Sequence, residues 1–97
     1  MSYTRVLVIE NPLSWAEGMK SFRKNTRPAL NAAKKAGVLK KYTLVQTGEH
    51  SGMLITEFET KAKMNKYIKA LAAIRRDVAA ETGGQMWGYG GSVKASG

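Results

Sequence analysis

The spacing of hydrophobic residues along the chain changes several times, and each change marks a boundary between predicted elements. Apolar residues form short runs or alternate with polar ones in four strand-like segments, at 4–10, 42–47, 53–58 and 85–94. They recur every three or four residues in two longer segments, at 14–37 and 60–82, which is the spacing of amphipathic helices. This order, β-α-β-β-α-β, predicts an α+β domain in which one antiparallel sheet carries both helices on one face.

The first predicted helix has signals at both ends and an interruption between them. Ser14 and Glu17 have the spacing of a capping box, in which the serine side chain accepts a hydrogen bond from the Glu17 amide. Gly37 suits the left-handed residue that ends many helices. Pro28 cannot donate a backbone hydrogen bond and disfavours helical geometry in the residue before it. We therefore expect a kink or break between Asn25 and Pro28.

The second predicted helix carries a charged residue on its apolar side. It begins after Thr60, an acceptable N-cap, and ends before Gly83. When the residues are placed about 100° apart around the helix axis, Arg75 falls in the apolar stripe, near Leu71 and Val78. Other basic residues of this helix point away from the stripe. Arg75 is therefore the cation that we expect to face the sheet.

The predicted strands are apolar on both faces. Residues 6–9 are all apolar, and the last strand places Trp87 and Tyr89 on one face and Met86 on the other. Two helices cover only one face of a sheet of this size, so the second apolar face needs a partner. A second copy of the chain is the simplest partner, and the sequence therefore predicts a homodimer.

Composition limits the classes of function. The 97 residues suffice for a single domain, spanning 1–97, with one modest core. The absence of cysteine excludes thiol nucleophiles and cysteine-based metal sites, and one histidine cannot build a usual zinc site. We therefore predict no metal and no cofactor. No apolar run reaches the roughly 20 residues of a membrane span, and the N-terminal residues lack signal-peptide features. We expect a cytoplasmic protein without membrane contact.

The chain is strongly basic, with 16 Lys and Arg residues, 7 Asp and Glu residues and a net charge of +9. Such a charge attracts nucleic acid, but most of the basic residues fall on the solvent faces of the helices, where they favour solubility. An RNA recognition motif has the same element order and carries stacking aromatics in its third strand. Segment 51–58 has aliphatic residues and Glu57 at those places, so nucleic acid is not the expected partner.

Three local features lead to a family resemblance that covers nearly the whole chain. They are the hairpin Gly48-x-x-Ser51-Gly52, the third strand ending in Glu57-Phe58-Glu59, and the first helix interrupted at Pro28 and followed by Gly37. With the element order, they resemble the dimeric α/β-barrel superfamily of ferredoxin-like proteins, which includes antibiotic-biosynthesis monooxygenases, muconolactone isomerases, EthD-like proteins and small stress-responsive proteins. The resemblance implies a homodimer whose two sheets close into a barrel, with a pocket between the helices and the sheet of each protomer.

Several aromatic, cationic and polar side chains are candidates for ligand binding in such a pocket. They are Trp15, Thr26, His50, Glu57, Tyr67, Arg75 and Trp87. Three interpretations of Arg75 stay open: it holds a carboxylate or enolate of a ligand, its guanidinium lies in water at the end of a packed stem, or it forms a salt bridge with a strand carboxylate such as Glu57. His50 lies at a hairpin tip, where histidines are usually solvated. Glu57 and Glu59 share a strand face. One interpretation of this pair is a general acid and base, and the other is a charged strand end before the second helix. No catalytic residue is assigned.

The sequence thus predicts a small homodimer that binds a partly apolar organic ligand between helices and sheet. Its activity would be that of a cofactor-independent monooxygenase or isomerase, or simple binding without catalysis. The alternative is a non-catalytic RNA-binding or regulatory module with the same fold, because a fold alone does not determine function.

Overall fold

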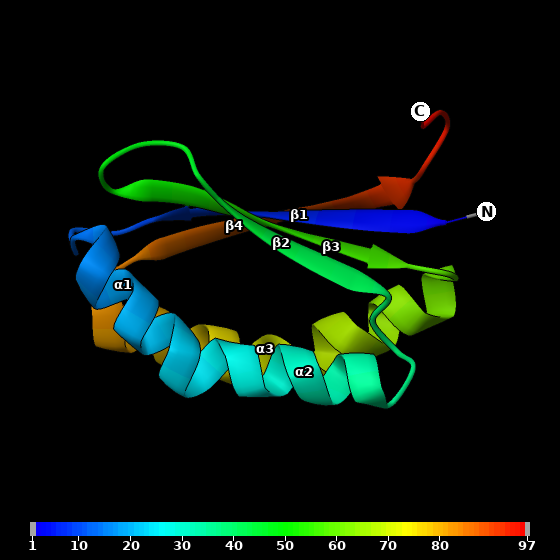
Figure 1. Cartoon of the computed structure of the whole chain (residues 1–97), viewed down its shortest axis with the longest axis horizontal. Helices are drawn as coiled ribbons and strands as arrows, with labels where there is room; N and C mark the ends of the chain where they lie inside the picture. The colour runs from blue at the N-terminus through cyan, green and yellow to red at the C-terminus, as the bar shows by residue number, and fades with distance from the viewer. Residues whose placement is uncertain (1, 97) are drawn as a thin grey trace.

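The computed structural model describes residues 2–96 and contains the predicted order of elements (Figure 1). The elements are β1 (Tyr3–Glu10), α1 (Trp15–Ser21), η1 (Phe22–Thr26), α2 (Arg27–Lys35), β2 (Lys41–Gln46), β3 (Ser51–Phe58), α3 (Lys61–Thr82) and β4 (Gln85–Ser92). The segment η1 is π-helical and joins α1 to α2. All helices lie against the same face of the four-stranded sheet, which confirms the predicted ferredoxin-like α+β fold.

The sheet has the strand order β2-β3-β1-β4, and every neighbouring pair is antiparallel. Leu7 of β1 pairs with Leu54 of β3, and both side chains point towards the helices, where they are buried. The next residue, Val8, pairs with Met53 and Trp87, which therefore point to the other face. No helix covers that face (Figure 1), and the sheet of the chain is open, with β2 and β4 at its edges.

The hydrophobic core lies between the helices and the sheet, towards the N-terminal end of α3. Its buried residues are Leu7, Leu30, Leu39, Leu54, Phe58, Met64 and Tyr67. The rings of Phe58 and Tyr67 pack with their centroids 5.1 Å apart and their planes tilted by 56°. Further along α3, Leu71 and Val78 face the same layer but are only half-buried. The packing therefore loosens towards the C-terminal half of this helix.

The first helix is irregular near the predicted place: the π-helical segment η1 covers Phe22–Thr26, and the helix then continues through Pro28 without a break. The backbone N–H of Arg27 donates to the carbonyl of Phe22, five residues back, as in a π-helix. Pro28 follows in the first turn of α2, where its missing N–H is tolerated. In a continuous α-helix that N–H would have bonded to the Lys24 carbonyl. The wider turn removes this conflict and keeps the helix running.

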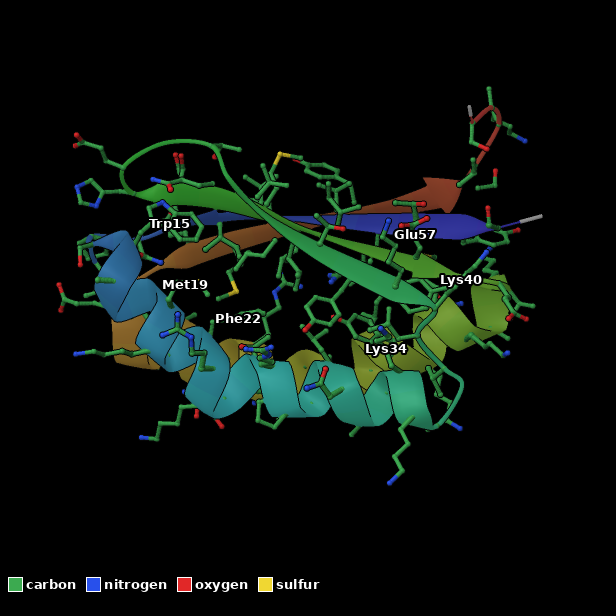
Figure 2. All side chains as sticks on the ribbon, in the orientation of Figure 1. Trp15, Met19, Phe22, Lys34, Lys40 and Glu57 are labelled. Atoms are coloured by element: carbon green, nitrogen blue, oxygen red, sulfur yellow. The ribbon has the colours of Figure 1, made fainter. Side chains whose placement is uncertain are left out.

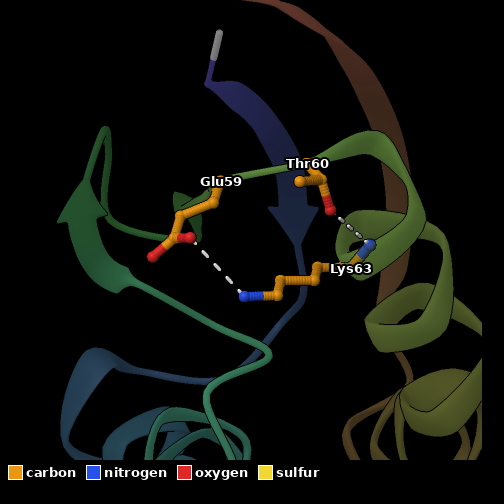
Figure 3. Close-up of polar contacts among 3 residues, drawn as sticks. All are labelled: Glu59, Thr60 and Lys63. Carbon is orange, nitrogen blue, oxygen red and sulfur yellow. Dashed lines mark hydrogen bonds and ion pairs between the residues drawn. The ribbon is translucent and has the colours of Figure 1, made fainter.

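The helix ends agree with the sequence signals. The Ser14 hydroxyl accepts a hydrogen bond from the Glu17 amide at 3.3 Å, so α1 has its predicted N-cap. At the start of α3, the Thr60 hydroxyl accepts from the Lys63 amide at 3.2 Å (Figure 3). That helix ends at Gly83, whose φ of 70° lies in the left-handed region that glycine adopts without strain.

Candidate functional site

A cavity of about 440 Å³ lies between the helices and the sheet, beside the core. The sheet contributes Leu7, Ile9, Leu54 and Met86, and the helices contribute Met19, Phe22, Leu71, Ile74 and Val78. Figure 2 shows Trp15, Met19 and Phe22 extending from α1 and η1 towards the sheet. The lining is predominantly apolar, so the cavity offers an organic molecule a surface from which water is easily displaced.

Trp15 fixes the end of the cavity at which α1 begins. Its indole Nε1 donates a hydrogen bond of 2.7 Å to the carbonyl of Gly48 in the β2–β3 hairpin. The ring lies directly on Gly52, where an added Cβ would stand only 2.8 Å from the Cη2 atom of the indole. Trp15 therefore ties α1 to the hairpin, and the glycine makes that contact possible.

Arg5 is a buried cation on the helix-facing side of β1. Its side chain lines the cavity, and the whole residue is 9% exposed. Gly88 of the neighbouring strand leaves room for the guanidinium, which a Cβ at that position would overlap. Burial lowers the pKa of Arg5, and the positive charge of Arg75 lowers it further, while Tyr67 acts in the opposite direction.

Tyr67 lies between the core and the cavity. It is buried, and this burial raises the pKa of its phenol to about 12, against a smaller opposing effect of the Arg5 charge. The phenol is therefore protonated at neutral pH and can donate a hydrogen bond. The Tyr67 hydroxyl has no protein hydrogen-bond partner within residues 2–96. Since no unpartnered polar atom of the described side chains is fully enclosed, this hydroxyl is open to the cavity.

Arg75 lines the cavity from α3, as its place in the apolar stripe predicts. Its Nη2 donates a hydrogen bond of 3.1 Å to the backbone carbonyl of Met86. The salt bridge with Glu57 considered from the sequence is wrong. Glu57 pairs across the sheet with Thr4 and Lys41, so its side chain belongs to the face that the helices do not cover.

The structure brings together five of the seven candidate residues around the cavity: Trp15, Thr26, His50, Tyr67 and Arg75. Thr26 enters from η1. His50 lies at the exposed hairpin, where its Nδ1 donates a 2.9 Å hydrogen bond to the carbonyl of Leu13. Glu57 and Trp87 do not line the cavity, because both point to the uncovered face of the sheet.

Arg5 is the cavity residue that sequence reasoning did not place among the candidates. A signal for it exists in the alternation of β1. Arg5 lies two residues before Leu7, and therefore shares the helix-facing side of the strand with it. Gly88 and Gly90 supply a second signal, because glycine within a strand often marks a close approach by another group.

Other kinds of site are less evident. Among the side chains that the structure describes, no three of His, Asp or Glu gather where they could hold a metal ion. No helix in the described part of the chain is both long and apolar enough to cross a membrane. A second, shallower hollow beside the hairpin is bordered by Glu10, His50 and Gln85.

Comparison with known proteins confirms the fold. No family model and no curated protein sequence matches the chain. The structure is similar to a dimeric ferredoxin-like protein from an uncultured marine organism, with 12% sequence identity and a TM-score of 0.76 over 99% of this chain and 97% of that chain. The chain has the ferredoxin-like fold. At this level of identity, the similarity concerns the fold and not the chemistry.

Two further similar structures belong to oxygenases. One is SnoaB, a cofactor-independent oxygenase from Streptomyces nogalater, with 10% identity and a TM-score of 0.72 over 98% of this chain and 95% of that chain. The other is a monooxygenase from the gene ActVA-Orf6 of Streptomyces coelicolor, in complex with nanaomycin D. It has 11% identity and a TM-score of 0.76 over 98% of this chain and 89% of that chain. These structures share the ferredoxin-like fold that the sequence predicted.

Proposed function

We propose that the protein is a homodimer that binds a small, mostly apolar organic molecule in the helix–sheet cavity of each protomer. The observation that carries this proposal is the cavity itself, about 440 Å³ in volume and lined mainly by aliphatic and aromatic side chains. Its size and lining are typical of small-molecule sites. A purely structural core would be packed more densely, because an apolar cavity lowers the free energy of unfolding.

The bound molecule, in this proposal, is oxygenated or isomerised without a cofactor. Support comes from SnoaB, a cofactor-independent oxygenase with the same fold. The cavity also holds arginine and tyrosine donors, and preorganised donors in a water-poor site stabilise negative charge that develops on a substrate oxygen. When this oxygen belongs to a carbonyl beside a CH₂ group, stabilising its charge makes the CH₂ group acidic. The CH₂ group loses one proton, and the resulting carbanion transfers electrons to dioxygen. R₂CH₂ and O₂ then give R₂C=O and H₂O.

The uncovered face of the sheet supports the homodimer. It carries Val6, Val8, Val45, Met53, Ile55, Trp87 and Tyr89. Trp87 and Tyr89 are 41% and 67% exposed in the single chain. An apolar patch of this kind on a small basic protein needs a partner, and the similar marine protein is dimeric.

Binding in the cavity can be tested by filling it. We expect 2-naphthol, a neutral two-ring phenol, to bind the wild type in a calorimetric titration. Thr26→Trp places an indole in the cavity and should weaken binding by about tenfold or more, as expected for the loss of a buried apolar contact surface. The matched control is Asn31→Trp, which adds the same side chain at an exposed position of α2. Equal binding by both variants would show that the ligand lies elsewhere.

Catalysis can be tested with anthrone, a three-ring ketone with one acidic CH₂ group. The proposal predicts enzyme-dependent oxygen uptake with formation of anthraquinone, at one O₂ per molecule of product. Thr26→Trp should abolish most of this uptake, and Asn31→Trp should retain it. Binding of 2-naphthol without any oxygen uptake would remove the oxygenase and leave the binding protein.

A further inference from the structure

Three arginines border the cavity, and they are Arg5, Arg75 and the exposed Arg76. Arg5 and Arg75 both line it, and they are close enough for the charge of each to affect the other. No carboxylate of the described side chains forms an ion pair with either arginine. Among the described lining residues the only carboxylate is Glu49, which lies exposed in the β2–β3 hairpin. Like charges at the edge of an apolar cavity repel each other and are costly to desolvate.

Arg5, Tyr67 and Arg75 share one hydrogen-bonding character at neutral pH, since each of them can donate. A guanidinium has several N–H donors and no acceptor, and the protonated phenol of Tyr67 adds an O–H donor. Arg75 uses one nitrogen on the carbonyl of Met86, while the guanidinium of Arg5 has no protein hydrogen-bond partner in residues 2–96. Such a set of free donors suits a ligand that supplies acceptors and negative charge.

The elements hold these donors on opposite walls of the same space. Tyr67, Leu71 and Arg75 follow one another at intervals of four residues, so they lie along one face of α3. Arg5 approaches them from the central strand β1, and Gly88 leaves the space that its guanidinium occupies. The electrostatic coupling of Arg5 to both Tyr67 and Arg75 agrees with this convergence.

We propose that Arg5, Arg75 and Tyr67 form an anion subsite, and that the ligand is an aromatic oxyanion whose charged oxygen lies among them. The apolar rings extend along Leu7 and Leu71. This inference rests on the proposed function, because it names the ligand class of the same cavity. It also explains why a buried strand position carries arginine, since the ligand supplies the counter-charge that the chain lacks.

The test compares two probes of the same shape, 2-naphthoate and its neutral analogue 2-naphthamide, in calorimetric titrations. We expect the wild type to bind the carboxylate at least tenfold more tightly than the amide, because charge-assisted hydrogen bonds are the stronger ones. Arg5→Met and Arg75→Met keep the apolar stem and remove the charge, so each should reduce that preference about tenfold. The matched control is Arg23→Met, which removes an exposed charge outside the cavity and should keep the preference.

One further variant, one stability measurement and one competitor separate the alternatives. Arg5→Lys should restore part of the preference if the charge matters. Arg5→Met should be at least as stable as the wild type, because it removes an unpaired buried cation, so a loss of binding is not caused by unfolding. Inorganic phosphate should not displace 2-naphthoate, since it has no apolar body, and displacement would show a site for free inorganic anions instead.

The outcomes distinguish this inference from the proposed function. If the wild type binds naphthamide and naphthoate equally, or if the Arg5 and Arg75 variants lose affinity for both probes alike, the anion subsite is wrong and the apolar cavity remains. If neither probe binds the wild type, the proposed function is wrong, and the inference that rests on it falls as well.

Discussion

The glycine at position 88 determines where the guanidinium of Arg5 lies. A Cβ at Gly88 would overlap that group, and a Cβ at Gly90 would stand 3.2 Å from the sulfur of Met64. Both glycines lie in β4 on its helix-facing side, opposite Leu7 and Arg5. The glycine-rich sequence of β4 therefore makes room for side chains from other elements.

A Gly88→Ala substitution tests this steric role. We expect it to lower the free energy of unfolding by about 1–3 kcal/mol, as overpacking of a filled site usually does. Gly91→Ala is the control in the same strand, because a Cβ there meets nothing within 4 Å. Chemical denaturation of both variants provides the measurement. Equal stabilities would mean that Arg5 moves aside at little cost.

Tyr67 provides a prediction about pH. Its pKa is raised to about 12 by burial, above the value of about 10 for tyrosine in an unfolded chain. The unfolded state therefore releases this proton first. The contribution of the protonated phenol to stability is complete below about pH 10 and is lost as the pH rises towards 12, by an amount on the order of 2–3 kcal/mol.

The measurement is a titration followed by tyrosinate absorbance. One of the four tyrosines should ionise only near pH 12, and this step should disappear in Tyr67→Phe. The stability of that variant should also fall less steeply above pH 10 than that of the wild type. An unchanged titration curve would show that the phenol of Tyr67 is solvated.

At the scale of single residues, sequence patterns predicted part of the site. The helical stripe identified Arg75 because the period of α3 is long and regular. Strand alternation separates residues into two sets but does not say which set faces the helices when both are apolar. For this reason Trp87 and Glu57 were expected near the cavity although they point away from it. The role of Arg5 was left undecided between a structural position and a ligand contact, and it was not placed among the candidates.

Among the elements, the bounds of the helices follow from local chemistry, and the geometry of their interruption does not. The caps at Ser14, Thr60 and Gly83 were predictable because each satisfies backbone groups within a few residues. Pro28 predicts that one hydrogen bond is missing, but several backbone arrangements avoid that loss. The chain adopts one of these arrangements, the π-helical segment η1.

The start of α3 allows two interactions at one helix end to be compared (Figure 3). Thr60→Ala removes the cap on the Lys63 amide and should lower the free energy of unfolding by about 1 kcal/mol. Thr60→Ser should retain most of that stability. Glu59→Gln removes an exposed ion pair with Lys63, 3.6 Å long, and should change stability by less than about 0.5 kcal/mol. If urea unfolding shows a larger loss of stability in Glu59→Gln than in Thr60→Ala, the ion pair and not the cap is the stronger interaction at this helix end.

The whole molecule has a covered face and an uncovered face, and they serve different purposes in this account. The covered face holds the core and the cavity. The uncovered face is apolar at its centre, where Val8 lies between Met53 and Trp87. The sequence predicted this division, because the strands are apolar on both faces of the sheet and two helices can cover only one of these faces. It could not predict the cavity, because its volume depends on how closely the helices pack.

Dimerisation can be tested at the centre of the uncovered face. Sedimentation at micromolar concentration should give twice the mass of the chain for the wild type. Val8→Lys places a charge at the centre of the contact and should give monomers, because an unpaired charge is costly to bury. Ala32→Lys, at an exposed position of α2, should remain dimeric. A monomeric wild type would contradict the account of this face.

The covering of this face in a dimer also bears on RNA binding. Trp87 and Tyr89 are the exposed aromatics of the uncovered face, and a dimer would cover them. With a net charge of +9, the protein should bind single-stranded RNA weakly and without base preference, and this binding should disappear by about 300 mM salt. Base-specific binding that survives that salt would favour an RNA-binding face instead.

The most direct test of the central claim is an isotope-filtered NOE spectrum of the dimer with 2-naphthoate. It reports which protein methyl groups lie next to the ligand. The account predicts contacts from the ligand protons to Leu7 and Leu71, which line the cavity. Contacts to Val8 and Ile55 alone would place the ligand on the opposite face of the sheet and contradict the account.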